Sequence, residues 1–94
     1  MHLESDFVIP FIYAQECPNC EKMRSYLEIL CDEYKCKLEA YDCETDKAVE
    51  AGIEYGIDDL PGCVIGGLVI KGDSFSKNLL ETAIQQWQLE NGIS

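Results

Sequence analysis

The residues best suited to chemistry in this 94-residue chain are two cysteines, Cys17 and Cys20. They are separated by Pro18 and Asn19, so the sulfurs are close enough to form a small disulfide. The motif follows an apolar run, residues 7–14, and opens a stretch whose apolar residues have helical spacing. The positive end of a helix stabilises a thiolate, the form of cysteine that attacks disulfides. The chemistry that the motif predicts is thiol–disulfide exchange.

The other four of the six cysteines follow at irregular spacings. Cys31 lies eleven residues after Cys20 and points in nearly the same helical direction, so we expect it to fill the core. Cys63 lies close to the expected site; a buried strand cysteine is favoured over a third redox thiol. The roles of Cys36 and Cys43 stay open.

Zinc binding is the competing use of these sulfurs. It would combine Cys17 and Cys20 with two of the remaining cysteines, yet no second Cys-x-x-Cys exists to complete a four-sulfur site. We therefore expect no metal and no cofactor beyond a Cys17–Cys20 disulfide. The alternative function kept open is a non-catalytic thiol protein that binds zinc or a partner protein through the same cysteine face.

The dithiol needs a strand before it and a helix after it. Residues 7–14 read as a strand buried on both faces, although Pro10 must lie near the strand's start or where one edge is unpaired. From Pro18 to Tyr34 apolar residues recur every three or four positions, which predicts an amphipathic helix with proline in its first turn. In residues 37–43 apolar and polar side chains alternate loosely, which predicts a second strand.

The rest of the chain predicts two more helices and a hairpin. Thr45 or Asp46 caps a short helix, and a Gly66-Gly67 turn joins strands 63–65 and 68–70. Ser76 caps a last helix, for which Gly92 is the stop. The order βαβαββα predicts an α/β domain with a four-stranded mixed sheet flanked by helices, and the dithiol at the carboxyl end of the first strand.

Length and charge limit the function. One domain spanning residues 1–94 is expected, because the chain is too short for two lobes. Its 18 acids against 7 bases would repel nucleic acid and anionic membranes. No membrane-spanning run is present, and the acidic N-terminus is unlike a secretory signal, so we expect a cytoplasmic monomer.

With these residues in place, the chain resembles a small glutaredoxin-like member of the thioredoxin superfamily. The resemblance covers nearly the whole chain and depends on Cys17-Pro18-Asn19-Cys20, on the segment from Tyr55 to Pro61, and on Gly72. It implies the thioredoxin fold, with Cys17 as the nucleophile and Cys20 as the resolving thiol. It also implies that Pro61 is a cis-proline and that Pro18, Asn19, Leu60 and Pro61 bind the substrate.

The chain departs from glutaredoxins in ways that bear on the electron donor. Gln15-Glu16 replaces the usual basic residue before the first cysteine, and Asp59-Leu60-Pro61 replaces Thr-Val-Pro. Glu16 also opposes the thiolate, so we expect a reducing protein. The partners that this implies are protein disulfides as substrates and, as donor, a thioredoxin-type reductase or a small dithiol rather than glutathione.

Overall fold

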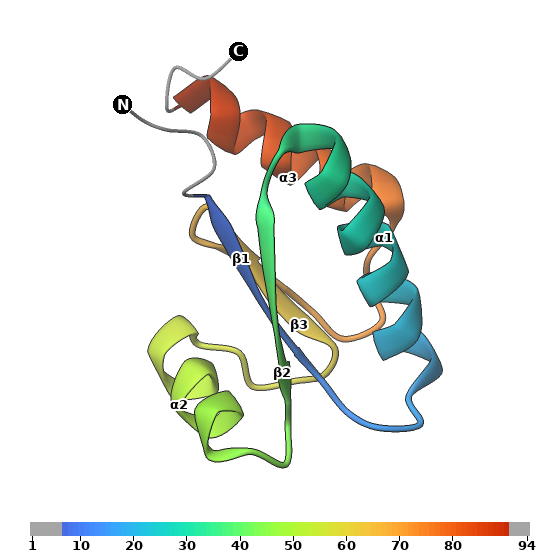
Figure 1. Ribbon diagram of the computed structural model, residues 1–94, viewed down its shortest axis with the longest axis vertical. Helices are drawn as coiled ribbons and strands as arrows, with labels where there is room; N and C mark the ends of the chain where they lie inside the picture. Colours follow the sequence, from blue (N-terminus) through green and yellow to red (C-terminus); the bar gives the residue numbers. More distant parts are fainter. Residues whose placement is uncertain (1–6, 91–94) are drawn as a thin grey trace.

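Seven elements follow one another along residues 7–90, the part of the chain that the computed structural model describes (Figure 1). They are β1 (Val8–Tyr13), α1 (Pro18–Tyr34), β2 (Lys37–Asp42), α2 (Asp46–Tyr55), β3 (Gly62–Ile65), β4 (Leu68–Lys71) and α3 (Lys77–Glu90). The predicted order βαβαββα is confirmed. The acidic residues 1–6 and the helix stop predicted at Gly92 lie outside the described residues.

The four strands form one sheet in the order β2-β1-β3-β4. β1 and β2 are parallel, because α1 carries the chain back to the edge where β1 began. β3 is antiparallel to β1, and β4 is antiparallel to β3, which completes the hairpin. The predicted four-stranded mixed sheet is therefore confirmed.

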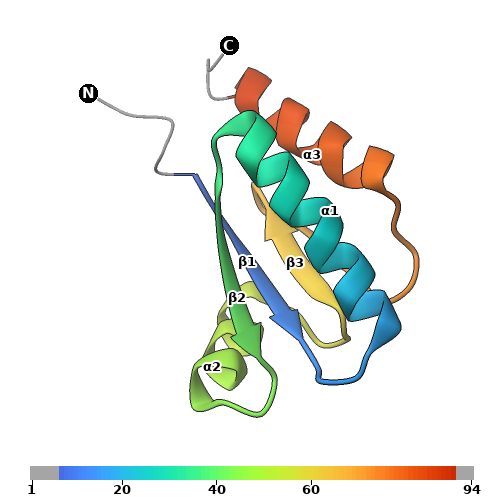
Figure 2. The same cartoon turned by 45° about the vertical axis from the view of Figure 1, so that its right-hand side comes forward.

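β1 is an inner strand with packed side chains on both of its faces. Ile9 and Phe11 join a large core under α1 and α3, whereas Ile12 joins a smaller core under α2. The alternation follows from the two-residue period of a strand. Figures 1 and 2 show α1 and α3 side by side on one face of the sheet and α2 on the other.

Pro10 occupies the middle of this inner strand, where a missing amide could disrupt the sheet. The Tyr13 carbonyl accepts a hydrogen bond from the Cys43 N–H just after β2, at 2.8 Å. Because backbone groups alternate along a strand, odd-numbered residues of β1 face β2 and Pro10 faces β3. Pairing with β3 covers only Phe11 and Ile12, so Pro10 lies at an unpaired stretch of that side, as expected.

The helices cover the sheet unequally. α1 buries five residues along one stripe, and its Tyr34 hydroxyl donates a hydrogen bond to Glu81 of α3 at 2.7 Å. α2 begins after its N-cap Thr45 and buries only two alanines. Its larger apolar residues, Val49 and Ile53, are 56% and 80% exposed, because the cluster beneath α2 is small.

The hairpin turn allows an aromatic stack at the end of the core. Gly66 and Gly67 have positive φ values of 58° and 90°, as the predicted tight turn requires. Trp87 of α3 lies against Gly66 and stacks on Phe7, with ring centroids 3.7 Å apart and planes 7° apart. A Cβ at position 66 would lie 2.4 Å from Trp87 Cδ1, so only glycine leaves room for the ring.

Gly66→Ala is therefore expected to lower the free energy of unfolding by about 2–3 kcal/mol, through overpacking and backbone strain together. Gly67→Ala is the matched control, because it has the positive φ but no atom within 4 Å of its added Cβ. It should cost about 1–2 kcal/mol. Urea denaturation followed by tryptophan fluorescence measures both, and equal losses would contradict the packing argument.

Candidate active site

Cys17 is the N-cap residue of α1, directly after the loop that leaves β1. Its backbone is extended, Pro18 occupies the first turn of the helix, and the Cys20 N–H donates a hydrogen bond to the Cys17 sulfur at 3.2 Å. Capping by a thiol satisfies one of the free amides at the helix start, a task usually performed by Ser, Thr or Asp. The sulfur therefore lies at the positive end of the helix dipole.

The loop before Cys17 turns sharply. Glu16 has a φ of 54°, a left-handed conformation that is costly for a residue with a side chain. The neighbouring Gln15 amide donates a hydrogen bond to Asp42 at the end of β2, at 2.6 Å. This contact fixes the loop to the sheet, so that Cys17 is held at the carboxyl end of β1.

Cys20 lies behind Cys17 and is only 2% exposed. The Ala14 N–H donates to the Cys20 sulfur at 3.4 Å. Burial, followed by the hydrogen bond with the Cys17 side chain, raises the pKa of Cys20 to about 11. The two thiols are therefore adjacent but unlike, since one is partly exposed and the other is buried and protonated at neutral pH.

A small hollow of about 110 Å³ adjoins the buried thiol, and Arg24, a residue not predicted from the sequence to belong to the site, lines it. The Arg24 guanidinium carbon lies 4.2 Å from the Tyr13 ring centroid, a cation–π contact at the end of β1. Arg24 follows Cys20 by four residues and therefore lies on the same side of α1. That spacing is the signal by which Arg24 could have been found.

The segment that ends in Leu60-Pro61 lies at the same edge of the sheet as the dithiol. Ile12, near the end of β1, is paired with Gly62, so Leu60 and Pro61 lie beside the start of the loop that leads to Cys17 (Figure 2). The Leu60-Pro61 peptide bond is cis, as the resemblance implied. The Pro61 carbonyl accepts a hydrogen bond from the Gly72 N–H at 2.8 Å, which connects this segment to the chain after β4.

Close packing also holds this segment in place. A Cβ at Gly62 would lie 2.2 Å from Ile57 Cγ2 and 2.9 Å from the Asp59 carbonyl oxygen. Only a glycine at position 62 therefore lets the segment fold back over Ile57 before β3 begins.

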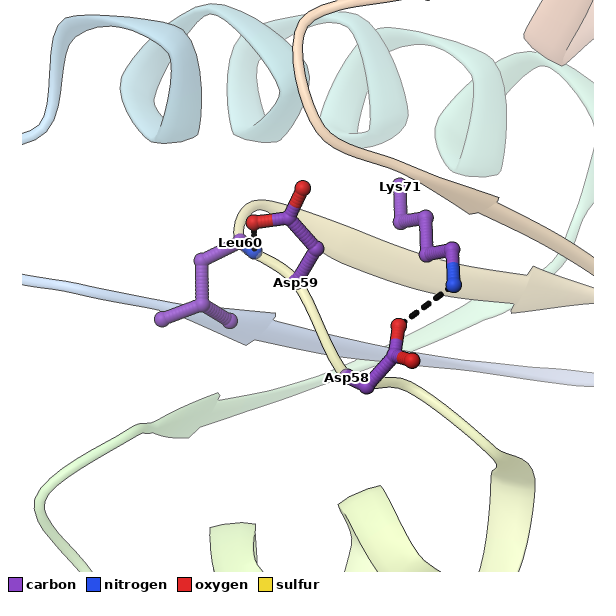
Figure 3. Close-up of polar contacts among 4 residues, drawn as sticks. All are labelled: Asp58, Asp59, Leu60 and Lys71. Carbon is purple, nitrogen blue, oxygen red and sulfur yellow. Dashed lines mark hydrogen bonds and ion pairs between the residues drawn. The ribbon is translucent and has the colours of Figure 1, made fainter.

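Two acids, Asp58 and Asp59, directly precede the Leu60-Pro61 bond and have separate partners (Figure 3). Asp58 forms an ion pair with Lys71 of β4, and the hydrogen bond from Lys71 lowers the pKa of Asp58. Asp59 accepts a hydrogen bond from the Leu60 backbone N–H at 2.9 Å. These contacts agree with solvated or capping acids in a turn and do not pair the carboxylates with each other.

The structure distinguishes the cysteines that the sequence left open. Cys63 is fully buried in the core under α1 and α3, and burial raises its pKa to about 12. It is therefore a buried strand cysteine, as favoured, and the third-thiol alternative is wrong on accessibility. Cys43 is partly exposed, and its charge contributes to the raised pKa of Cys20, which places it near the dithiol.

The predicted substrate-binding residues differ in exposure. Pro18 and Asn19 are exposed, Leu60 is half-buried and Pro61 is buried. Within residues 7–90, no three or more His, Cys, Asp or Glu side chains are grouped so that they could hold a metal ion. The described part of the chain also has no helix long and apolar enough to cross a membrane.

A scan against protein-family models and a search of curated proteins find no match to this sequence. Solved structures do resemble the chain. Thioredoxin 1 from the thermophilic eubacterium Thermosipho africanus TCF52B matches with a TM-score of 0.71 and 14% identity, over 92% of this chain and 99% of that one. A mutant thioredoxin from Halobacterium salinarum NRC-1 matches with a TM-score of 0.70 and 19% identity, over 88% and 77%.

The oxidised thioredoxin from Plasmodium falciparum matches with a TM-score of 0.63 and 20% identity, over 85% of this chain and 79% of that one. At such identities the likeness concerns the fold. With its mixed sheet, its three helices and two adjacent cysteines at the start of α1, the chain has the thioredoxin fold.

Proposed function

We propose that the protein is a glutaredoxin-like thiol–disulfide oxidoreductase that reduces protein disulfides. One observation carries the proposal: a partly exposed thiol caps a helix, and a buried, protonated thiol lies directly behind it. The first arrangement suits Cys17 as the nucleophile, and the second suits Cys20 as the resolving thiol. Adjacent thiols of unlike character suit the two successive steps of disulfide exchange.

The reaction begins when the Cys17 thiolate attacks one sulfur of the substrate disulfide. A Cys17–substrate mixed disulfide forms, and the other substrate sulfur leaves as a thiolate and takes up a proton. Cys20 then loses its proton and attacks the Cys17 sulfur, which releases the second substrate thiol and forms the Cys17–Cys20 disulfide. The substrate gains two electrons and two protons, and a donor dithiol returns both to the protein.

The substrate chain is proposed to lie in an extended pose beside Leu60 and Pro61, with Pro18 and Asn19 on its other side. The exposure of Pro18 and Asn19 and the position of Leu60 at the same sheet edge support this pose. A net charge of −11 favours a protein donor with a basic docking face, or an uncharged dithiol, over anionic glutathione. A cytoplasmic location is part of the proposal, because the working form must be returned to the dithiol state.

Reduction of insulin disulfides, with dithiothreitol as donor and a chelator present, tests this function. Cys17→Ser is expected to lose activity to the uncatalysed background, because no nucleophile remains at the helix start. Reduced Cys20→Ser, mixed with insulin after the dithiothreitol has been removed, should accumulate a covalent Cys17–substrate adduct, visible by mass spectrometry. Cys36→Ser is the matched control, since it removes another partly exposed thiol at the far end of α1 and should keep full activity.

Equal activity of the wild type and Cys17→Ser would overturn the proposal. Loss of activity on chelation alone would instead favour the zinc-binding alternative. The described residues contain no cluster that supports that alternative.

The unlike environments of the two thiols predict selective alkylation of the reduced protein. With a pKa of about 11, about one part in ten thousand of Cys20 is thiolate at pH 7. Iodoacetamide at pH 7 should therefore modify Cys17 and spare Cys20. Because the thiolate fraction rises with pH, the rate of Cys20 modification in Cys17→Ser should rise about tenfold per pH unit above pH 7. The rate should level off only near the pKa that Cys20 has in this variant. Peptide mapping of quenched samples measures it, and a plateau near pH 8 would contradict the burial argument.

The Asp59 carboxylate accepts a hydrogen bond from the Leu60 backbone N–H, directly before the cis-proline. A substrate carbonyl in the proposed pose would need this N–H as its donor. Asp59→Ala is therefore expected to raise kcat/KM for a protein disulfide about 3- to 10-fold, the equivalent of one net hydrogen bond. Asp58→Ala removes the same charge without freeing that N–H and is the matched control. An equal rise in both variants would show that net charge, and not the Leu60 N–H, sets the rate.

A further inference from the structure

We propose that Cys31 and Cys36 form a second dithiol, which exchanges with small-molecule disulfides and closes to a disulfide between the end of α1 and the start of β2. This site is separate from Cys17 and Cys20 and does not depend on the function proposed for them. Its parts are a backbone motif, a contact between two thiols and an open surface hollow.

The end of α1 brings the two cysteines together. The N–H groups of Lys35 and Cys36 both donate to the Cys31 carbonyl, the second at 2.9 Å, and Lys35 has a φ of 62°. A six-to-one hydrogen bond over a left-handed residue is the Schellman motif. In this motif the residue after the left-handed position commonly packs against the residue five places earlier. Here both of those residues are cysteines, so the motif itself sets one sulfur against the other.

The two thiols lie on one side of this motif and are not equivalent. Their interaction raises the pKa of Cys31 and lowers that of Cys36. Burial raises the pKa of Cys31 further, since only 6% of this residue is exposed. Cys36 is partly exposed, and its thiol also lies 3.8 Å from the Tyr34 carbonyl. Cys36 therefore has the properties of the attacking thiol and Cys31 those of the second.

A reactant can reach this pair. A surface hollow of about 530 Å³ lies between the last turn of α1 and the start of β2, and both cysteines line it. Lys35 and Lys37 line the hollow and flank Cys36 in the sequence, so they place positive charge next to its thiolate. Glu28 and Asp32 line the hollow too, which leaves its lining with two charges of each sign. A small disulfide fits in such a space without rearrangement of the core.

The pair cannot exchange with the Cys17–Cys20 pair of the same molecule. Cys20 and Cys31 lie eleven residues apart on one continuous helix, about 16 Å along its axis. Attack requires sulfur atoms in contact, so the oxidant for Cys31 and Cys36 must come from outside the molecule. This is why the proposal names a small-molecule disulfide.

The exchange takes place in two steps. The Cys36 thiolate attacks one sulfur of the small disulfide, forms a mixed disulfide and releases one small thiolate, which is protonated. The Cys31 thiol loses its proton and attacks the Cys36 sulfur, which releases the second small thiol. The protein loses two electrons and two protons, and the small disulfide gains both as two thiols.

The test uses the full chain with Cys17→Ser and Cys20→Ser, which leaves four of the six cysteines. The protein is equilibrated with 2-hydroxyethyl disulfide, an uncharged probe, then alkylated and digested with trypsin. Trypsin cuts after Lys35, so a Cys31–Cys36 disulfide joins the separate peptides 25–35 and 36–37. We expect this linked pair to exceed any other disulfide about tenfold, because the backbone motif holds the two cysteines side by side.

Two further variants in the same background sharpen the result. Cys36→Ser should abolish the loss of two thiols, whereas Cys43→Ser, which removes the other partly exposed cysteine, should leave the linked pair unchanged. Recovery of Cys36 as a lasting mixed disulfide with the probe, or of both cysteines in alkylated form, would overturn the proposal. So would an equal loss of the linked peptides in both variants.

Discussion

β1 lies between two layers of helices, and the rest of the fold depends on the burial of both of its faces. Ile9 and Phe11 anchor α1 and α3, while Ile12 anchors α2. β1 is also an inner strand, paired with β2 and β3, and its carboxyl end opens into a loop at the edge of the sheet. That loop carries Cys17, and pairing of β1 with β3 brings Leu60 and Pro61 to the same edge.

The two ends of α1 place cysteines in different backbone environments. At its N-terminus free amides point outward, and a thiol takes the place of a capping hydroxyl. At its C-terminus a left-handed residue turns the chain, and two sulfurs take the place of the usual apolar contact. In both places cysteine performs a structural task that a non-reactive residue performs elsewhere. The helix is long enough to keep the two pairs apart, so each depends on its own surroundings.

The features that could be predicted from the sequence are those set by neighbouring residues. The order of elements follows from the periods of apolar residues, and the boundaries follow from Pro18, Thr45, Ser76 and the Gly66-Gly67 turn. The position of the dithiol follows from the same local rules, because a strand followed by a helix leaves the intervening residues at the sheet edge. The sequence also limited the place of Pro10, because its missing amide must face an unpaired side of the strand.

Only the tertiary structure decided how the remaining residues are used. Val49 and Ile53 are exposed although they are apolar, because the small cluster beneath α2 is filled by the two alanines of this helix and by residues of other elements. The contact of Arg24 with Tyr13 joins α1 to the end of β1, and the burial of Cys63 depends on helices packed over β3. The sequence by itself determined which elements form and where Cys17 and Cys20 lie, because those depend on local backbone preferences. The packing of helices on the sheet decided which thiols are buried, exposed or in contact, because burial depends on residues distant in the chain.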